Sequence, residues 1–407
     1  MTTEISEAQT AKNRKKGAEQ PFCKVAYMTP PQENWNEFRV PSQRNENFIT
    51  EECYLAMKNA GFTHGLGLYE HGKDIALRAL RVAEKTGLKY YVRDYVNWTG
   101  ATEPEIWHLF KKDYLEYAGY SSFAGVYVYD EPPVGLFARV ERLVRGYRAV
   151  LGEKGEPLVN LLPVYANDVE QLGAPYEEYL RLYAETVSTD YILFDHYPFG
   201  ADENGNNRFR SDYLYNLKAV AEVCKKYGKN LRTFIQSFSP ARRKALLTYA
   251  EIALQVNCAL AYGSRYFAYF HYWGSMESGG LGLVDCKGNP TSVYYAVKSV
   301  HENLKYIEEE TKGFVWENFE LIQGENAAFK IRASSDLVAG EFVNGSRKGY
   351  YLVNYSYDEQ KENAVSIGLT GKWRCAKSDG SESFEGAGCA NISLKAGEAA
   401  FFAEIGK

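Results

Sequence analysis

The sequence has few histidines, and its cysteines show none of the spacings that hold a metal or a disulfide framework. Six histidines occur in 407 residues, without an H-x-H or H-E-x-x-H pattern, although ligand side chains are present at His64, His71, Asp94, Asp195, His196 and His271. The seven cysteines are scattered with no C-x-x-C pair, so we expect reduced thiols. A glycine-rich phosphate loop followed by lysine is also missing. We therefore expect neither a metal nor another cofactor.

Long apolar runs and an excess of positive charge are missing too. No run approaches the roughly 20 apolar residues that span a bilayer. The net charge of -5 argues against nucleic acid or an anionic membrane as a partner. Residues 1–21 are polar and lack the apolar run of a signal peptide, and this composition predicts a disordered tail. We expect a cytoplasmic protein with no nucleic-acid or membrane partner.

What the sequence does contain is a regular alternation of short apolar runs with longer amphipathic ones. The apolar runs predict strands at 23–28, 64–69, 90–93, 125–129, 158–162, 191–194, 232–235 and 266–270. The amphipathic segments predict helices at 50–60, 73–86, 102–117, 136–151, 176–188, 211–227, 242–262 and 291–307. Eight strand–helix units favour a closed (β/α)8 TIM barrel over a doubly wound sheet. We predict a catalytic barrel over residues 22–312.

The pattern changes after the eighth unit. From residue 313 the chain has short alternating strands separated by Gly, Asn, Ser and Asp, as in "VAGEFV" and "GYYLVNY". This pattern predicts a small all-β sandwich over residues 313–407. Because the segment offers no convergent acids, we expect a structural domain that packs on the barrel.

Polar residues recur where the predicted strands end, which is where a TIM barrel carries its active site. The predicted site comprises Glu70, Arg93, Asp94, Trp98, Asp130, Glu131, Asp195, His196, Tyr197, Gln236, His271, Tyr272 and Trp273. Two long loops follow the sixth and eighth strands and are expected to shape a substrate cleft. The recurrence of polar groups at the strand ends is stronger evidence than any one of them.

Two adjacent carboxylates end the fourth predicted strand in "GVYVYDEPP", residues 125–133. Neighbouring residues of a strand face opposite ways, so one acid is expected to face the substrate unless the strand bends. Glu131 has the longer reach, and an acid in a semi-enclosed aromatic site can hold its proton near neutral pH. We expect Glu131 to be a general acid and Asp130 to orient a substrate hydroxyl or tune Glu131.

This arrangement resembles the large clan of glycoside hydrolases built on a (β/α)8 barrel with an acid/base Glu after strand four. The resemblance rests on "YVYDEP", on "FDHYPF" after strand six and on "YFHYW" at strand eight, and it covers about residues 22–307. It implies that Glu131 is the acid/base and that His196 or Tyr197 contacts the sugar ring.

The sequence departs from this clan at strand seven, where the clan carries its nucleophilic Glu and this chain has Gln236. An amide cannot attack an anomeric carbon, so a second carboxylate must come from elsewhere. Asp195 is the first choice, followed by Asp94 and Glu70. We expect strands four and six to end well apart, which suits the 6.5–9.5 Å spacing of inverting enzymes. A substrate-assisted route, with Asp130 orienting a 2-acetamido group, also stays open.

These observations predict a glycoside hydrolase that cleaves a short oligosaccharide or glycoside by carboxylate acid/base catalysis. Glu131, Asp195 and Asp130 are the expected catalytic residues, and the expected partner is a carbohydrate substrate. The alternative is a catalytically impaired barrel that binds carbohydrate without hydrolysis, because Gln236 replaces the nucleophile of the clan.

Overall fold

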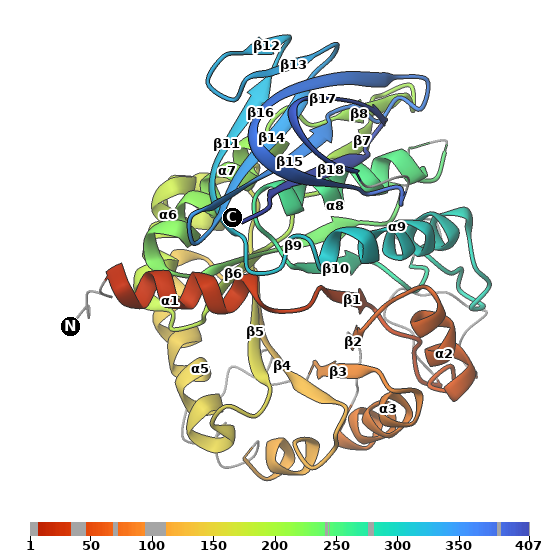
Figure 1. The fold of residues 1–407 in the computed structure, drawn as a ribbon. Coiled ribbons are helices and arrows are strands. Elements are labelled where there is room, and N and C mark those ends of the chain that lie inside the picture. Colours follow the sequence, from red (N-terminus) through yellow and green to blue (C-terminus); the bar gives the residue numbers. More distant parts are fainter. Residues whose placement is uncertain are drawn as a thin grey trace.

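A closed barrel of eight parallel strands forms the larger part of the computed structural model, which describes residues 7–33, 46–67, 72–93, 111–240, 243, 245–275, 281–380 and 384–406. Around the ring the strands follow the order β1–β2–β3–β4–β5–β6–β9–β10, and β10 pairs back with β1 (Figure 1). Their bounds are Cys23–Tyr27, His64–Leu66, Lys89–Val92, Phe123–Asp130, Glu156–Leu161, Tyr191–Phe194, Asn230–Gln236 and Tyr266–Phe270. The predicted TIM barrel is confirmed.

Helices follow the strands and surround the barrel (Figure 1). Their bounds are α2 (Glu51–Asn59), α3 (Lys73–Thr86), α5 (Phe137–Leu151), α6 (Tyr176–Thr186), α7 (Tyr213–Tyr227), α8 (Tyr249–Ala261) and α9 (Ser292–Glu308). Residues 111–117 are also helical. A 3-10 turn at Val134–Leu136 precedes α5, a π turn at Asp168–Leu172 precedes α6, and a hairpin of β7, Phe199–Ala201, and β8, Asn207–Phe209, precedes α7.

Capping residues explain where several helices begin and end. The Thr50 side chain accepts a hydrogen bond from the Cys53 backbone at the start of α2, and Gly87 ends α3 with a φ of 70°. Helix α8 begins later than the predicted residue 242, because Thr248 and Glu251 form a capping box there. The prediction of a helix over residues 242–262 therefore placed its start too early.

The second part of the chain is a small all-β sandwich, as predicted. Its antiparallel strands β11 to β18 span Val315–Ile322, Glu325–Asn326, Ile331–Ala333, Leu337–Asn344, Arg347–Asn354, Glu362–Lys377, Phe384–Lys395 and Ala399–Glu404. The long strand β16 pairs with β13 through its first half and with β18 through its second half. It therefore connects the two layers, which enclose buried side chains such as Leu352, Ile367 and Phe402.

Helix α8 lies between the barrel and the sandwich (Figure 1). Its residues are buried without interruption from Ala250 to Ala261, as in a helix covered on all sides. The face of β14 and β15 that points away from the sandwich interior packs on α8. Its residues Phe342 and Tyr351 belong to the same apolar cluster as the barrel core. Asn257 Nδ2 donates to the Gly397 carbonyl at 2.7 Å, and Tyr351 Oη donates to Asn257 Oδ1 at 2.8 Å.

The predicted disorder of residues 1–21 is wrong for Glu7–Ala18, which form helix α1. Arg14 of this helix donates to the Trp316 carbonyl and lies 3.1 Å from a Glu317 carboxylate oxygen of β11. The polar composition of the segment concealed these tertiary contacts, because a polar helix can be held by ion pairs and packing to a partner surface. The domain limits at residues 22, 312 and 313 stay predictions. No helix in the described ranges is both long and apolar enough to cross a membrane.

Candidate active site at the C-terminal end of the barrel

Glu131 follows directly after β4 in a backbone conformation that is rare for a residue with a side chain. Its φ is 51°, in the left-handed region, which is sparsely populated except by glycine and is enriched at functional sites. Its backbone N–H donates to the Asn160 carbonyl at 2.9 Å, and Pro132 follows. The left-handed turn breaks the alternation of the strand, so Asp130 and Glu131 do not have to face opposite sides.

Asp130 accepts hydrogen bonds from three neighbours. Tyr127 Oη donates to its Oδ1 at 2.6 Å and Asn160 Nδ2 at 3.3 Å, while Arg93 Nη2 lies 3.3 Å from Oδ2. The Asp130 side chain keeps 36% of its surface exposed. It therefore combines three hydrogen-bond donors with access to a ligand.

Asn160 connects the ends of three neighbouring strands. Its Nδ2 donates to Asp195 Oδ1 at 2.9 Å as well as to Asp130, and its carbonyl accepts from Glu131. Asp195 follows β6 and is only 5% exposed. The Oδ1 atom of Asn160 is buried and has no hydrogen-bond partner among the described residues.

The carboxyl groups of Glu131 and Asp195 are hydrogen-bonded to each other. Burial of its carboxyl group and the charge of Asp130 raise the pKa of Glu131 to about 7, although the residue as a whole is exposed to solvent. Burial and the charge of Glu131 raise the pKa of Asp195 well above its ordinary value, while the hydrogen bond from Asn160 opposes this. The pair is therefore expected to hold a proton at neutral pH.

The predicted wide separation of the carboxylates on strands four and six is wrong. Only β5 lies between β4 and β6, and Asn160 Nδ2 of β5 lies 2.9 Å from Asp195 Oδ1 and 3.3 Å from Asp130 Oδ1. Two carboxylates bonded to one amide nitrogen lie closer together than the 6.5–9.5 Å that leaves room for a water in inverting glycosidases.

Arg93 and four tyrosines surround the three acids. The Arg93 guanidinium contacts Tyr27 Oη and lies 4.9 Å from the centre of the Tyr127 ring. On the other side, the Tyr165 hydroxyl accepts a hydrogen bond from the Tyr197 backbone at 3.4 Å. Burial, the charge of Asp195 and the neighbouring Tyr165 raise the pKa of Tyr197. Arg93 and Tyr197 were predicted members of the site. The structure brings Arg93 to Asp130, whereas the Tyr197 ring packs on Phe238 and Phe270.

His196 does not face the acids, contrary to the prediction that it contacts substrate. Its Nε2 lies 2.9 Å from Asp212 Oδ1, and its ring packs between Tyr165 and Tyr213, with centroid distances of 5.1 and 5.3 Å. The residue is 1% exposed. Because successive residues at the end of β6 point in opposite directions, Asp195 occupies the inward position and His196 the outward one.

Gln236 is a buried structural amide. Its Nε2 donates to the carbonyls of Phe199 and Phe238 at 2.7 and 3.1 Å, and its Oε1 accepts from the Phe199 backbone at 2.8 Å. The two amide donors therefore hold the segments that follow β6 and β9. We withdraw Gln236 from the substrate-binding residues for this reason.

The three aromatic residues after β10 are core residues rather than an exposed platform for a sugar. His271 uses both ring nitrogens, with Nδ1 2.7 Å from the Trp273 carbonyl and Nε2 3.2 Å from Ser275 Oγ. Tyr272 and Trp273 are each 1% exposed and pack on Phe62 and Phe48. The predicted substrate contacts of all three find no support in this geometry, because the chain covers them.

Other predicted members lie outside the described residues, namely Glu70, Asp94 and Trp98. The predicted site did not include Asn160, Tyr27, Tyr127 and Tyr165. A polar residue inside the apolar run "PLVNLL" was the available signal for Asn160. The tyrosines gave no separate signal, because this chain has 33 of them. Among the described residues, no three His, Cys, Asp or Glu side chains are grouped as a metal site requires.

Comparisons with known proteins identify related folds. No protein-family model and no curated protein matches the sequence. Among solved structures, the chain is similar to Amy13B of Eubacterium rectale, with 11% identity over 98% of this chain and 99% of the other and a TM-score of 0.57. It is also similar to a structure described as a glycoside hydrolase (12% identity, 94% and 92% coverage, TM-score 0.55).

A third similar structure is a glycoside hydrolase family 5 protein from Bacteroides vulgatus, with 12% identity, coverage of 94% of this chain and 89% of the other, and a TM-score of 0.53. Structural neighbours of this protein are thus glycoside hydrolases with TIM-barrel folds. At such identities the likeness concerns the fold, and it leaves the activity to be argued from the site.

Proposed function

We propose that the protein is a glycoside hydrolase that cleaves a short oligosaccharide or glycoside, with Glu131 as the general acid. The observation that carries this proposal is the cluster of Asp130, Glu131 and Asp195 at the C-terminal end of the barrel. A TIM barrel carries its active site at this end. The glycoside hydrolases among its structural neighbours support the same class.

Glu131 meets the requirements of a general acid. Its pKa of about 7 keeps part of the carboxyl protonated at neutral pH, where proton donation is most effective. Its exposed position at the mouth lets it reach the oxygen of a leaving group. Asp195, buried beneath it, shares the hydrogen bond that holds the carboxyl in place.

The second catalytic role fits Asp130 better than Asp195. A nucleophile or a base must be ionised, whereas burial and the charge of Glu131 raise the pKa of Asp195 and favour its neutral form. Asp130 accepts three hydrogen bonds and keeps part of its surface exposed. We therefore assign the attacking or stabilising carboxylate to Asp130 and revise the role expected for Asp195.

The reaction then proceeds in two displacements. Glu131 donates its proton to the glycosidic oxygen as the bond from this oxygen to the anomeric carbon breaks, and an Asp130 oxygen bonds to that carbon. Water, deprotonated by Glu131, then attacks the anomeric carbon and releases both the sugar and the Asp130 carboxylate. Asp130 and Glu131 are adjacent in the chain, and the left-handed turn at Glu131 lets both face the cleft, which suits the closely spaced carboxyl groups of retaining enzymes rather than the wide spacing of inverting ones. A substrate with a 2-acetamido group can replace Asp130 as the nucleophile, with Asp130 orienting it.

Hydrolysis of a library of aryl glycosides, followed by natural oligosaccharides, tests the proposal. Proton NMR of the first-formed product should show retention of the anomeric configuration, and Asp130→Asn should abolish turnover while leaving the fold intact. Inversion would overturn the assignment of Asp130. Binding of sugars without turnover of any substrate would favour a barrel that binds carbohydrate without cleaving it.

A further inference from the structure

A cavity lies at the opposite end of the barrel from Glu131. It encloses about 330 Å³ and is lined by Cys23, His64, Glu156, Asn230 and Tyr266 among others. These five are the first residues of β1, β2, β5, β9 and β10. A volume of this size is at the lower end of the range of small-molecule sites, and the proposed glycosidase chemistry does not use it.

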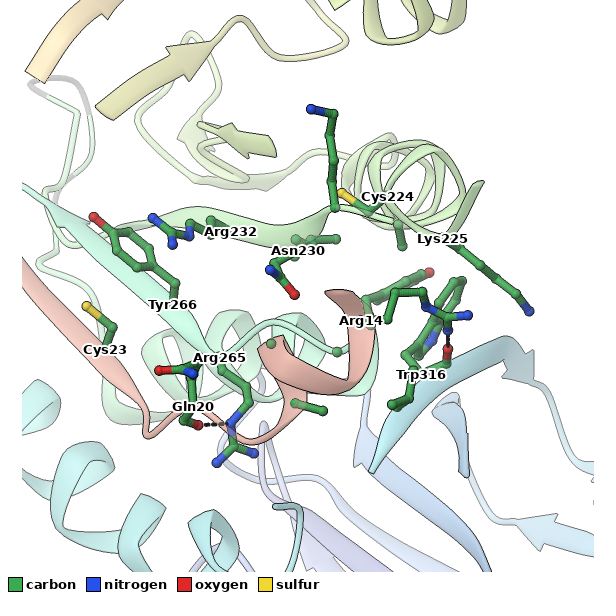
Figure 2. A pocket seen from close by; sticks show the side chains of 18 of the residues that line it. Arg14, Gln20, Cys23, Cys224, Lys225, Asn230, Arg232, Arg265, Tyr266 and Trp316 are labelled. Atoms are coloured by element: carbon green, nitrogen blue, oxygen red, sulfur yellow. Dashed lines mark hydrogen bonds between the residues drawn. The ribbon is translucent and has the colours of Figure 1, made fainter. Parts of the chain in front are cut away.

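Helix α1 and strand β11 close this cavity from outside the barrel. Arg14, Gly17 and Ala18 of α1 and Trp316 of β11 belong to its lining. Figure 2 shows Tyr266 and Arg232 on one side of the cavity, and Arg14 with Trp316 on the other. The helix fits closely, because a Cβ atom added at Gly17 would collide with the Asn230 side chain. The site thus exists only where α1, the barrel and the sandwich meet.

Two hydrogen-bond donors in the lining are buried without a partner. Tyr266 Oη and Trp316 Nε1 have none among the described residues, and the two residues are only 4% and 8% exposed. Leaving such a group unsatisfied costs about 1–3 kcal/mol. An indole N–H can only donate, and a phenol readily donates, so the missing partner is an acceptor.

The charges around the cavity are mostly positive. Its lining includes the cations Arg14, Arg232, Arg265, Lys225 and Lys229, while Glu156 is the one carboxylate among the lining residues that the structure describes. Arg232 pairs with Glu156 at 2.7 Å, and Arg14 and Lys225 share Glu317. Among the described residues, the Lys229 ammonium donates to the backbone carbonyls of Val187 and Thr189.

We propose that this cavity binds a compact organic anion, whose carboxylate or phosphate oxygens accept from Tyr266 and Trp316. The surplus of cations supplies the attraction, and the rings of Tyr262 and Phe314 cover the apolar part of the ligand. Ordered water is the competing occupant, since water also satisfies buried polar groups. Because the ligand would touch α1, the barrel and β11 together, its binding should stabilise the whole chain.

Thermal unfolding of the full-length protein tests this inference. Citrate, inorganic phosphate and glucose 6-phosphate serve as anionic probes, and glucose and potassium chloride at matched ionic strength serve as controls. A bound anion should raise the Tm with concentration, by at least about 2 °C near saturation, and the carboxylate and phosphate probes separate the two chemistries. A Tm that no anion raises above the controls would mean that only water fills the cavity and would overturn the proposal.

Two conservative substitutions locate the site. Tyr266→Phe and Trp316→Phe remove a donor and keep a ring, so each should weaken binding of the active anion about tenfold in calorimetry. Tyr295→Phe, at an exposed tyrosine of α9, is the matched control, and Glu131→Gln should bind the anion as the unaltered protein does. Equal affinity in Tyr266→Phe, Trp316→Phe and the control would place the anion elsewhere and contradict the inference.

Discussion

The two ends of the barrel shift the pKa values of their carboxyl groups in opposite directions. At the mouth, which is the C-terminal end of the barrel, Arg93 contacts Asp130, and its charge acts on Glu131 less strongly than burial does. The pKa values of Glu131 and Asp195 are raised there, mainly by burial. At the opposite end of the barrel, which we call the floor and where the strands begin, burial also acts to raise the pKa of Glu156. The charge and hydrogen bonds of Arg232 outweigh this effect, so the pKa of Glu156 is lowered overall.

The difference shows that the balance of neighbouring charges, rather than burial alone, decides whether a carboxyl group keeps its proton. Arg232 contacts both Glu156 oxygens, at 2.7 and 3.0 Å, and Tyr91 Oη donates to one of them at 2.5 Å. Glu131 has a second carboxyl group as its hydrogen-bond partner instead. The floor is thus organised for a fixed charge, and the mouth for a transferable proton.

The largest expected effect comes from removing the transferable proton. Glu131→Gln keeps the shape of the side chain but cannot donate, so turnover should fall about 10²–10⁴-fold. Aryl glycosides with a good leaving group should recover part of this loss, because they need little protonation. Steady-state kinetics measure the effect, and Glu178→Gln on the exposed face of α6 is the control. Unchanged turnover would remove Glu131 from the mechanism.

Breaking the ion pair at the floor should destabilise the protein rather than slow it. Arg232→Met leaves Glu156 without its cation and should lower the free energy of unfolding by roughly 2–4 kcal/mol, between the values for exposed and fully buried pairs. Their side chains are 17% and 27% exposed. Chemical denaturation gives this value, and the double variant Arg232→Met/Glu156→Gln should regain part of it. A loss under about 1 kcal/mol would show that the pair is unimportant.

Asp195→Asn, unlike Arg232→Met, should stabilise the protein at neutral pH. The raised pKa means that the folded state binds the Asp195 proton more tightly than the unfolded chain does. This contribution to stability is complete below the unfolded pKa of about 4 and is lost as pH rises through the folded pKa. At pH 7 the variant should therefore be more stable than the unaltered protein, whereas at pH 4 the difference should be small.

Asp190→Asn, at an exposed carboxylate before β6, is the control for this comparison. Urea unfolding between pH 4 and pH 8 gives the dependence. A variant that loses stability most at pH 7 would mean that Asp195 is ionised in the folded protein, against the proposed proton sharing.

A smaller effect is expected from Asn160, which links the acids. Its hydrogen bond lowers the pKa of Asp195, so Asn160→Ala should raise the pKa of the pair that Asp195 forms with Glu131. The alkaline limb of kcat/KM, which reports the pKa of the acid in the free enzyme, should move upward by less than about one pH unit. A lower kcat with an unmoved pH profile would instead indicate a purely structural role.

The sequence predicted the barrel and the sandwich well, because these follow from hydrophobic periodicity. The position of the site at the strand ends stays a prediction. The inward direction of single side chains was harder to predict. The left-handed turn at Glu131 and the buried position of the Gln236 amide depend on tertiary contacts with Asn160 and Phe199, respectively. The nearness of the carboxylates on strands four and six, by contrast, follows from the strand order of a barrel, which the wide-spacing expectation did not take into account.

Carboxyl titration by NMR tests the contrast between the two ends most directly. With ¹³C-labelled glutamate, and with Glu131→Gln and Glu156→Gln to assign the two signals, each group can be followed from pH 3 to pH 9. Glu131 should titrate with an apparent pKa near 7 and Glu156 below its ordinary value of 4.5. A Glu131 signal that titrates near 4.5 would contradict its assignment as a general acid.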